Sequence, residues 1–240
     1  MRWGSEKILK MKLLLVGLPL GNIEDISLRA IRVLKEARLV ICEDTRVFRK
    51  LWLKLGSLGY LTGEFTGKLE VINEYNEKEK IPDLIEEIRN YEDAILVTDA
   101  GMPTISDPGF RLMKRVLELG GKITSAPGPT ALTTAMCLSG LSSDRVLFLG
   151  FLPKKNSKRE KIFKAIKGFD ELGLTVAIYE PARSVKKTVK EIKNYFGEVE
   201  MVIARELTKR YEEIIRGEME KTKLKGELVL LWRLSKEKKG

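Results

Sequence analysis

The first half of the chain alternates short apolar runs with amphipathic segments. The apolar runs are uninterrupted, which is typical of strands buried on both faces of a parallel sheet. In the segments between them, apolar residues recur at steps of three and four, as in a helix with one buried face. The pattern predicts strands at 12–16, 39–42, 94–98 and 122–126, and helices at 27–37, 46–55, 82–91 and 109–119, with Pro82 as the first residue of its helix.

The second half has longer apolar runs and fewer crossovers. We expect strands at 145–151, 174–180, 200–205 and 227–234, and helices at 130–139, 157–168 and 184–196, with a capping box of Ser157 and Glu160. The predicted fold is a two-domain α/β protein: a mostly parallel N-terminal sheet with helices on both faces, a C-terminal mixed sheet, and a ligand cleft between them. The predicted boundaries are an extension at 1–10, a first domain at 11–126 and a second at 127–240.

Three Pro- and Gly-containing loops follow predicted strands of the first domain, at 17–22, 99–109 and 127–131. In open α/β sheets, ligands bind at the carboxyl ends of the strands, so these loops predict a small-molecule pocket. Pro19 has no N–H to offer a phosphate, and the glycine spacing does not match the dinucleotide pattern. The loops suit a nucleoside with a cationic or zwitterionic tail, a shape that S-adenosylmethionine has. The alternative is that they are only tight turns.

The composition limits the possible chemistry. The chain has no histidine and two cysteines, Cys42 and Cys137, which we expect in the core, so we expect no metal site. Any proton transfer then falls to Asp, Glu, Lys, Tyr or water. No apolar stretch is long enough to span a bilayer and no signal-peptide pattern opens the chain, so we expect a cytoplasmic protein without a membrane partner.

The formal net charge of +10 leaves two interpretations open. Abundant Lys and Glu with no Gln is typical of heat-adapted proteins that carry ion-pair networks. Such networks need both signs, however, and the excess of positive charge favours a polyanionic partner, most simply RNA. Basic residues recur at 154–161, 186–190 and 236–239.

Seven blocks of sequence together resemble the RsmI group of the tetrapyrrole-methylase superfamily. They occur in family order at 16–27, 42–46, 99–109, 127–131, 150–153, 179–180 and 204–209. The resemblance implies a two-domain methyltransferase, usually a homodimer, that binds S-adenosylmethionine between its domains. It also implies 2′-O-methylation of a cytidine ribose in small-subunit (16S) ribosomal RNA, presented as RNA or as the ribosomal subunit. The chain departs from the family at Val47 and Tyr75, where histidine is usual, and at Met102, where threonine is usual.

The resemblance also assigns cofactor contacts to matching positions of this sequence. Those in the first domain and at the junction are Leu20, Gly101, Met102, Pro103, Ile105, Thr130 and Ala131, and those in the second domain are Tyr179 and Ala204. A fairly apolar slot lined with carbonyl groups favours the dispersal of positive charge as a sulfonium becomes a thioether. Pro, Met and Ile fit this requirement.

Glu43, Asp44 and Arg46 follow the second predicted strand and are the candidate catalytic residues. A carboxylate at this place can orient or deprotonate a ribose 2′-hydroxyl, while Arg46 and Arg49 can pair with flanking phosphates. The alternative is a helix cap with a surface ion pair. Arg205 and Lys209 form a second candidate substrate-binding cluster, for which the alternative is an interdomain salt bridge.

Two other functions stay open at this level. C-methylation of a tetrapyrrole uses the same fold, and fold alone does not decide between substrates. A non-catalytic ribosome-binding protein with a vestigial cofactor site is the second alternative. The blocks at 43–46 and 204–209 favour the RNA-modifying group.

Overall fold

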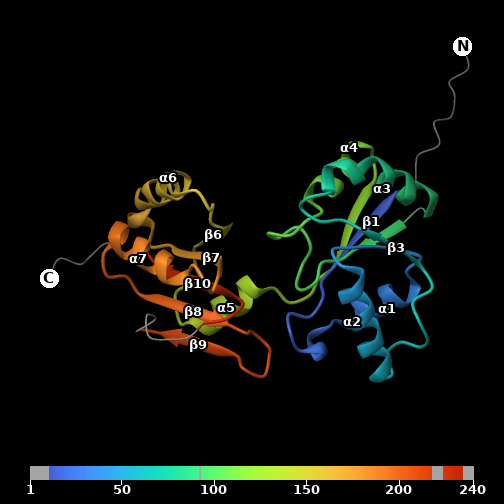
Figure 1. Ribbon diagram of the computed structural model, residues 1–240, viewed down its shortest axis with the longest axis horizontal. Coiled ribbons are helices and arrows are strands. Elements are labelled where there is room, and N and C mark those ends of the chain that lie inside the picture. Colours follow the sequence, from blue (N-terminus) through green and yellow to red (C-terminus); the bar gives the residue numbers. More distant parts are fainter. Residues whose placement is uncertain (1–10, 92, 218–223, 235–240) are drawn as a thin grey trace, which may run out of the picture. The chain divides into compact units, whose positions relative to one another are not determined.

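A computed structural model describes residues 11–91, 93–217 and 224–234 of the chain. Its internal contacts divide these residues into two units, the first ending at Pro129 and the second beginning at Thr130 (Figure 1). The predicted extension at 1–10 and the basic residues at 236–239 lie outside the described residues. The predicted α/β class, with a parallel sheet followed by a mixed one, is confirmed.

The first unit is built on a parallel five-stranded sheet with the order β3-β2-β4-β1-β5. Neighbouring strands pair in register, for example Leu13 with Ala94 of β4 and with Ile123 of β5. The strand β1 therefore lies between β4 and β5, although both follow it by many residues. The strands are β1 (Lys12–Val16), β2 (Leu39–Cys42), β3 (Lys68–Val71), β4 (Asp93–Leu96) and β5 (Lys122–Ala126).

Helices cover both faces of this sheet because successive strand residues point to opposite sides. Leu13 and Leu15 pack toward α3 (Glu77–Tyr91) and α4 (Phe110–Glu118), whereas Val16 packs toward α1 (Leu28–Glu36) and α2 (Thr45–Ser57). A short 3-10 helix, η1 (Ile23–Asp25), precedes α1.

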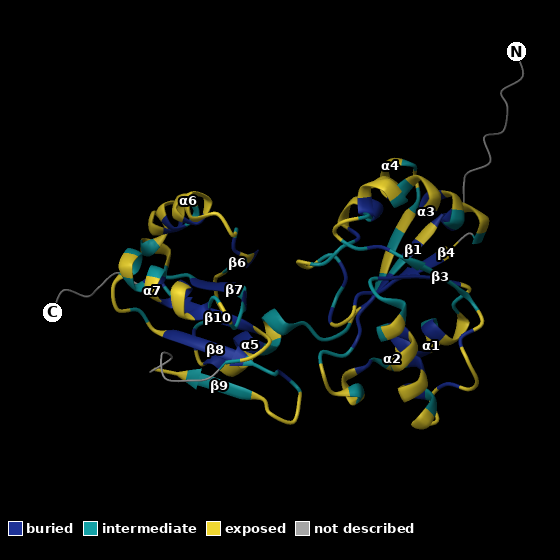
Figure 2. Cartoon of the chain, in the orientation of Figure 1, coloured by how far each residue is buried: buried dark blue, intermediate teal, exposed yellow. Residues whose placement is uncertain are grey.

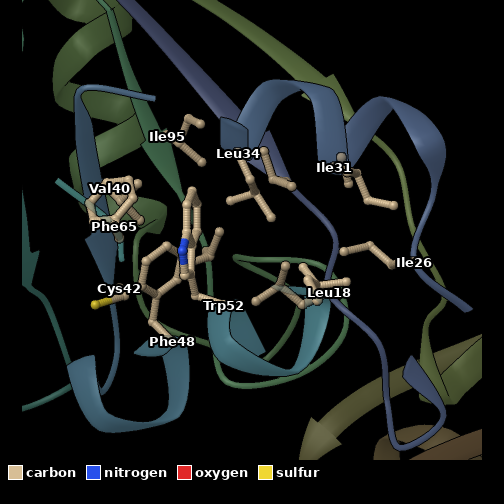
Figure 3. Close-up of a cluster of buried hydrophobic side chains, with 14 of the residues drawn as sticks. Leu18, Ile26, Ile31, Leu34, Val40, Cys42, Phe48, Trp52, Phe65 and Ile95 are labelled. Carbon is tan, nitrogen blue, oxygen red and sulfur yellow. The ribbon is translucent and has the colours of Figure 1, made fainter. Parts of the chain in front are cut away.

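The α2 side of the sheet is closed by an aromatic cluster (Figure 3). The rings of Trp52 and Phe65 meet edge to face with centroids 5.0 Å apart. The indole nitrogen of Trp52 donates to the carbonyl oxygen of Gly63 at 2.9 Å, so the loop after α2 is fixed by both apolar and polar contacts.

The second unit has a mixed five-stranded sheet with the order β6-β7-β10-β8-β9, in which only β6 and β7 are parallel. The helices α6 (Asn156–Lys167) and α7 (Val185–Phe196) pack on one face, and α5 (Ala131–Ser139) packs on the other. The strands are β6 (Val146–Phe151), β7 (Thr175–Pro181), β8 (Met201–Arg205), β9 (Glu213–Arg216) and β10 (Glu227–Arg233), and η2 (Asp170–Leu172) follows α6.

Three local expectations are wrong. Pro82 lies inside α3, because the helix already begins at Glu77 after a turn in which Asn73 Oδ1 accepts the N–H of Asn76 at 3.1 Å. The capping box of Ser157 and Glu160 does not form, because α6 begins one residue earlier with Lys155 as its N-cap. Cys42 is buried as expected, but Cys137 is exposed.

Candidate functional site

The three Pro- and Gly-containing loops follow three adjacent strands, β4, β1 and β5. All three strands are parallel, so the loops share the carboxyl edge of the first sheet. This edge is where ligands bind in open α/β folds. The structure thus brings together, within one unit, loops that are up to 110 residues apart in sequence (17–22, 99–109 and 127–129).

Backbone hydrogen bonds hold these loops against one another. The N–H of Gly17 donates to the carbonyl oxygen of Ala126 at 3.0 Å, and Leu18 and Gly101 exchange two bonds of 2.9 and 3.0 Å. The N–H of Gly128 points at the Met102 sulfur at 3.3 Å. These four N–H groups are therefore already hydrogen-bonded and are not available to a phosphate at this edge.

The approach of the loops requires glycine at Gly17. A Cβ placed on Gly17 would lie 2.6 Å from the Gly128 nitrogen and 2.7 Å from the Met102 sulfur. Backbone cannot yield at such distances as a flexible side chain does, so any larger residue would push the loops apart.

The loop between β4 and α4 contains unusual backbone conformations. Thr104 and Ser106 have φ values of 72° and 64°, and Gly101 and Gly109 have φ values of 75° and 108°. The left-handed region costs a residue with a side chain about 1–2 kcal/mol. Such conformations gather at ligand-binding and catalytic sites, where the surrounding structure enforces them.

Glu77 fixes the far end of this loop and is a residue that the sequence analysis missed. Its Oε1 accepts the N–H of Gly109 at 3.2 Å and the N–H of Arg111 at 2.9 Å. Gly109, the N-cap of α4, has no side chain for this purpose, so a buried carboxylate from α3 supplies the cap. The block at 75–77 was the available signal, but it entered the sequence analysis only through the departure at Tyr75.

The candidate catalytic cluster lies at the carboxyl end of β2. Asp44 is the N-cap of α2, where its Oδ1 accepts the N–H of Arg46 at 2.8 Å. The Arg46 guanidinium also donates to Asp44 Oδ2 at 2.6 Å, and these hydrogen bonds lower the pKa of Asp44 to about 2. The helix cap and ion pair offered as the alternative interpretation are therefore present. A carboxylate with so low a pKa is a weak base but a firm anchor for Arg46, and Arg49 is exposed one turn further along α2.

Asp99, at the start of the loop after β4, is the second residue that the sequence analysis missed. Because β2 and β4 are neighbours, Asp99 lies close enough to Asp44 to feel its charge. Partial desolvation and repulsion by Asp44 raise the pKa of Asp99. Burial and the same two carboxylates raise the pKa of the Cys42 thiol to about 12, so that thiol stays protonated. Asp99 is thus the more basic of the two neighbouring carboxylates, and Glu43 also lies at this edge.

The predicted cofactor-binding residues of the first unit all lie on the loops described. Leu20 comes close to Gly101, since a Cβ on Gly101 would be 3.4 Å from the Leu20 side chain. Pro103 is buried, Met102 holds Gly128, and Ile105 is 42% exposed, which leaves apolar surface available at the loop.

The predicted cofactor-binding residues of the second unit lie close to one another as well. Thr130 caps α5 by accepting the N–H of Thr133 at 3.2 Å. Ala131, Tyr179 and Ala204 belong to one apolar cluster, in which Ala204 is fully buried and Tyr179 is partly buried. The Tyr179 ring also packs edge to face on Phe148 at a centroid distance of 4.9 Å.

The candidate cluster at Arg205 and Lys209 is held by local ion pairs within the second unit. Arg205 Nε donates to Glu213 Oε2 of β9 at 2.6 Å, and the Lys209 ammonium lies 3.5 Å from Glu206 Oε1. Glu206 and Thr208 have positive φ values of 49° and 64°, so the loop after β8 is another site of backbone strain.

Within residues 11–91, 93–217 and 224–234, no three His, Cys, Asp or Glu side chains gather as a metal site would require. Over the same residues, no helix combines the length and apolar character needed to cross a bilayer.

Comparison with known proteins gives consistent matches over both units. The family of Tetrapyrrole (Corrin/Porphyrin) Methylases matches residues 12–222. Ribosomal RNA small subunit methyltransferase I of Rickettsia prowazekii is 38% identical over 231 residues, which cover 93% of this chain and 79% of that protein. The protein of the same name from a Hydrogenobaculum species is 38% identical over 237 residues, or 95% of this chain and 96% of that protein. Among solved structures, diphthine synthase has a TM-score of 0.70 at 18% identity over 94% of this chain and 90% of that chain, a likeness of fold alone.

Proposed function

The chain belongs to the tetrapyrrole methylase family, and from this premise we propose that it 2′-O-methylates a cytidine ribose of small-subunit ribosomal RNA with S-adenosylmethionine. The names of the curated relatives support the RNA substrate. The observation that carries the proposal is the joint placement, at one sheet edge, of three closely packed loops and an acidic pair beside an arginine. The loops fit the cofactor and the polar groups fit a ribose and its phosphates.

The loops after β1, β4 and β5 suit the cofactor better than they suit a phosphorylated coenzyme. The N–H groups of Gly17, Leu18 and Gly101 are bonded to carbonyl oxygens and are therefore not available to a pyrophosphate. Carbonyl groups and the apolar surface of Ile105 remain for an adenosine and a cationic centre. Bound there, S-adenosylmethionine supplies an electrophilic methyl group on a sulfonium. Leu20, Gly101, Met102, Pro103 and Ile105, with Thr130, Ala131, Tyr179 and Ala204 from the second unit, are the proposed binding residues.

The β2 and β4 ends supply the groups that act on the ribose. We propose that Asp99 accepts the proton of the ribose 2′-hydroxyl, because its raised pKa makes it a better base than Asp44. Asp44 keeps Arg46 in place, and Arg46 and Arg49 pair with phosphates beside the target nucleotide. Glu43 is the alternative proton acceptor. Much of the rate comes from positioning, so a strong base is not required.

The remaining parts of the proposal concern partners. Arg205 ends β8 and Lys209 lies in the strained loop that follows it, and both are proposed to contact the RNA of the small subunit. A homodimer is proposed from the family resemblance alone.

The substrate class is tested by tritium transfer from labelled cofactor. Wild-type protein is incubated in parallel with small ribosomal subunits, with naked 16S RNA and with a porphyrinogen. We expect label in the RNA of at least one of the first two samples and none in the porphyrinogen. Label in the porphyrinogen alone would favour C-methylation of a tetrapyrrole, and label in no sample would favour a non-catalytic ribosome-binding protein.

A further inference from the structure

The surface of α6 and α7 carries a strong local excess of positive charge. The segments 154–167 and 183–193 contain twelve Lys and Arg residues and only two acidic ones, Glu160 and Glu191. Most of these basic residues are exposed. Figure 2 shows exposed positions along both α6 and α7. The twelve are Lys154, Lys155, Lys158, Arg159, Lys161, Lys164, Lys167, Arg183, Lys186, Lys187, Lys190 and Lys193.

Both acidic residues are already engaged by basic residues of the same surface. Glu191 accepts from the buried guanidinium of Arg159, with 2.9 Å between Oε2 and Nε. Glu160 pairs with Lys164 at 2.7 Å. Among the residues that the structure describes, seven exposed lysines of these segments take part in no ion pair. One of them, Lys167, ends α6, and the other six, Lys154, Lys155, Lys158, Lys161, Lys186 and Lys190, are called the α6–α7 basic surface.

The helices α6 and α7 pack side by side on one face of the sheet, so their exposed lysines, with Lys154 and Lys155 just before α6, belong to one helical layer. Asn156 Oδ1 at the start of α6 accepts from the Lys187 ammonium at the start of α7, at 2.7 Å. Beneath this contact, Arg159 donates to the Thr188 hydroxyl at 2.7 Å, and that hydroxyl donates to the buried Glu180 at 2.7 Å. The spacing of the lysines that lie on the two helices is therefore set by contacts within the unit and not by flexible loops.

Heat adaptation does not explain this distribution of charge. Ion-pair networks stabilise a protein by alternating the two signs, and here one sign is left in excess. Neither helix has an acidic residue in its first turn, so the positive ends of both helix dipoles add to the field of the lysines. Six like charges on one surface repel one another, which costs stability unless a polyanion is bound.

We propose that the α6–α7 basic surface binds the phosphate backbone of the RNA substrate. This inference rests on the proposed function, because it takes RNA as the occupant and assigns the second unit the task of holding it. Lysine ammonium groups are point charges without a planar fork, which suits contacts to phosphates and not the reading of bases. Recognition of the target nucleotide is left to other residues.

The test compares two triple variants that lose the same charge. Lys155→Gln, Lys158→Gln and Lys186→Gln are combined in one protein, and the exposed lysines of α1, α2 and α4 are replaced as Lys35→Gln, Lys54→Gln and Lys114→Gln in the control. Binding of 16S ribosomal RNA is measured as a function of salt. Each lost phosphate contact lowers the slope of log K against log salt by about 0.7–0.9, so the first triple should lose about 2 in slope and about tenfold in affinity. The control should change less than twofold.

Three readouts separate this inference from the proposed function. The first triple should keep its cofactor affinity and its kcat at saturating RNA, while KM rises about tenfold. Equal RNA affinity and slope in the two triples would overturn the inference even if methylation is intact. If the wild-type protein binds RNA without methylating it and the first triple variant loses that binding, the result supports the inference and contradicts the proposed function. Binding to phosphatidylserine vesicles is measured in parallel. If the first triple variant loses vesicle binding but keeps its RNA affinity, the surface binds a membrane and the inference is overturned.

Discussion

The polar groups at the carboxyl edge of the first sheet and those buried under α6 and α7 of the second unit are held in opposite ways. In the first unit, Asp99 and the left-handed residues Thr104 and Ser106 lie at the carboxyl edge of the sheet, where they cost stability. In the second unit, the polar residues Glu180, Thr188 and Arg159 are buried and hydrogen-bonded to one another. Unfavourable groups that persist at one sheet edge indicate a function there, whereas a satisfied buried network indicates a scaffold. We therefore expect chemistry from the first unit and RNA affinity from the second.

The largest effect expected from this comparison is that of Asp99→Asn. Loss of the carboxylate should lower kcat by at least about 100-fold, because the 2′-hydroxyl loses its proton acceptor. The raised pKa of Asp99 in the folded state means that its ionised form destabilises the fold, so Tm at neutral pH should stay equal or rise. This difference in Tm should shrink as the pH falls and wild-type Asp99 becomes protonated. Full activity in the variant would remove Asp99 from the mechanism.

The second effect concerns the close approach of the loops. Gly17→Ala forces a methyl group against Gly128 and should reduce S-adenosylmethionine affinity at least tenfold, as measured by calorimetry. Gly56→Ala is the matched control. Gly56 lies inside α2, and a Cβ placed on it would be 3.7 Å from the Leu61 carbonyl oxygen, which is an ordinary contact distance. The control should bind cofactor normally and be more stable by up to about 1 kcal/mol. Similar cofactor affinity in both variants would contradict the placement of the binding loops.

The third effect separates the support of the loop from its chemistry. Glu77→Ala leaves the N–H groups of Gly109 and Arg111 without their acceptor and should cost about 1–3 kcal/mol in urea unfolding, with weaker cofactor binding. Glu77→Gln keeps an oxygen at the same place and should recover most of the loss. If the two variants are equally destabilised, the capping role of Glu77 is wrong.

The smallest effect is a shift in the pH profile. Asp44→Asn removes a negative charge that raises the pKa of Asp99, and it frees Arg46, whose charge lowers that pKa. Both changes favour the ionised form of Asp99, so the acid limb of kcat should move to lower pH even though the overall rate falls. A limb that stays in place, or moves to higher pH, would show that Asp99 is not the group that titrates.

The sequence predicts the buried strands of the sheets better than it predicts the strands at their edges. Runs such as 12–16 and 39–42 are apolar at every core position, so both were recognised with the observed bounds. The strands Lys68–Val71 and Glu213–Arg216 were missed because they lie at sheet edges, are only four residues long and each contain two charged residues.

The same limit explains which site residues were missed. The loops were found from Pro and Gly, which act locally. The coupling of Asp99 to Asp44 depends on β4 lying beside β2, and the cap supplied by Glu77 spans 32 residues. Such relations are set by strand order, which no local pattern contains. The roles of Glu43, Asp44, Arg46 and Arg49 remain predictions.

The most direct test of the account is the chemical position of the transferred methyl group. Small-subunit ribosomal RNA modified by the wild-type protein is digested to nucleosides and analysed by mass spectrometry. The account predicts 2′-O-methylcytidine with the wild-type protein and none with the Asp99→Asn protein. With the triple lysine variant it predicts less 2′-O-methylcytidine than with the wild type when the RNA concentration is limiting. A methyl group on a base, or methylation that Asp99→Asn leaves unchanged, would contradict it.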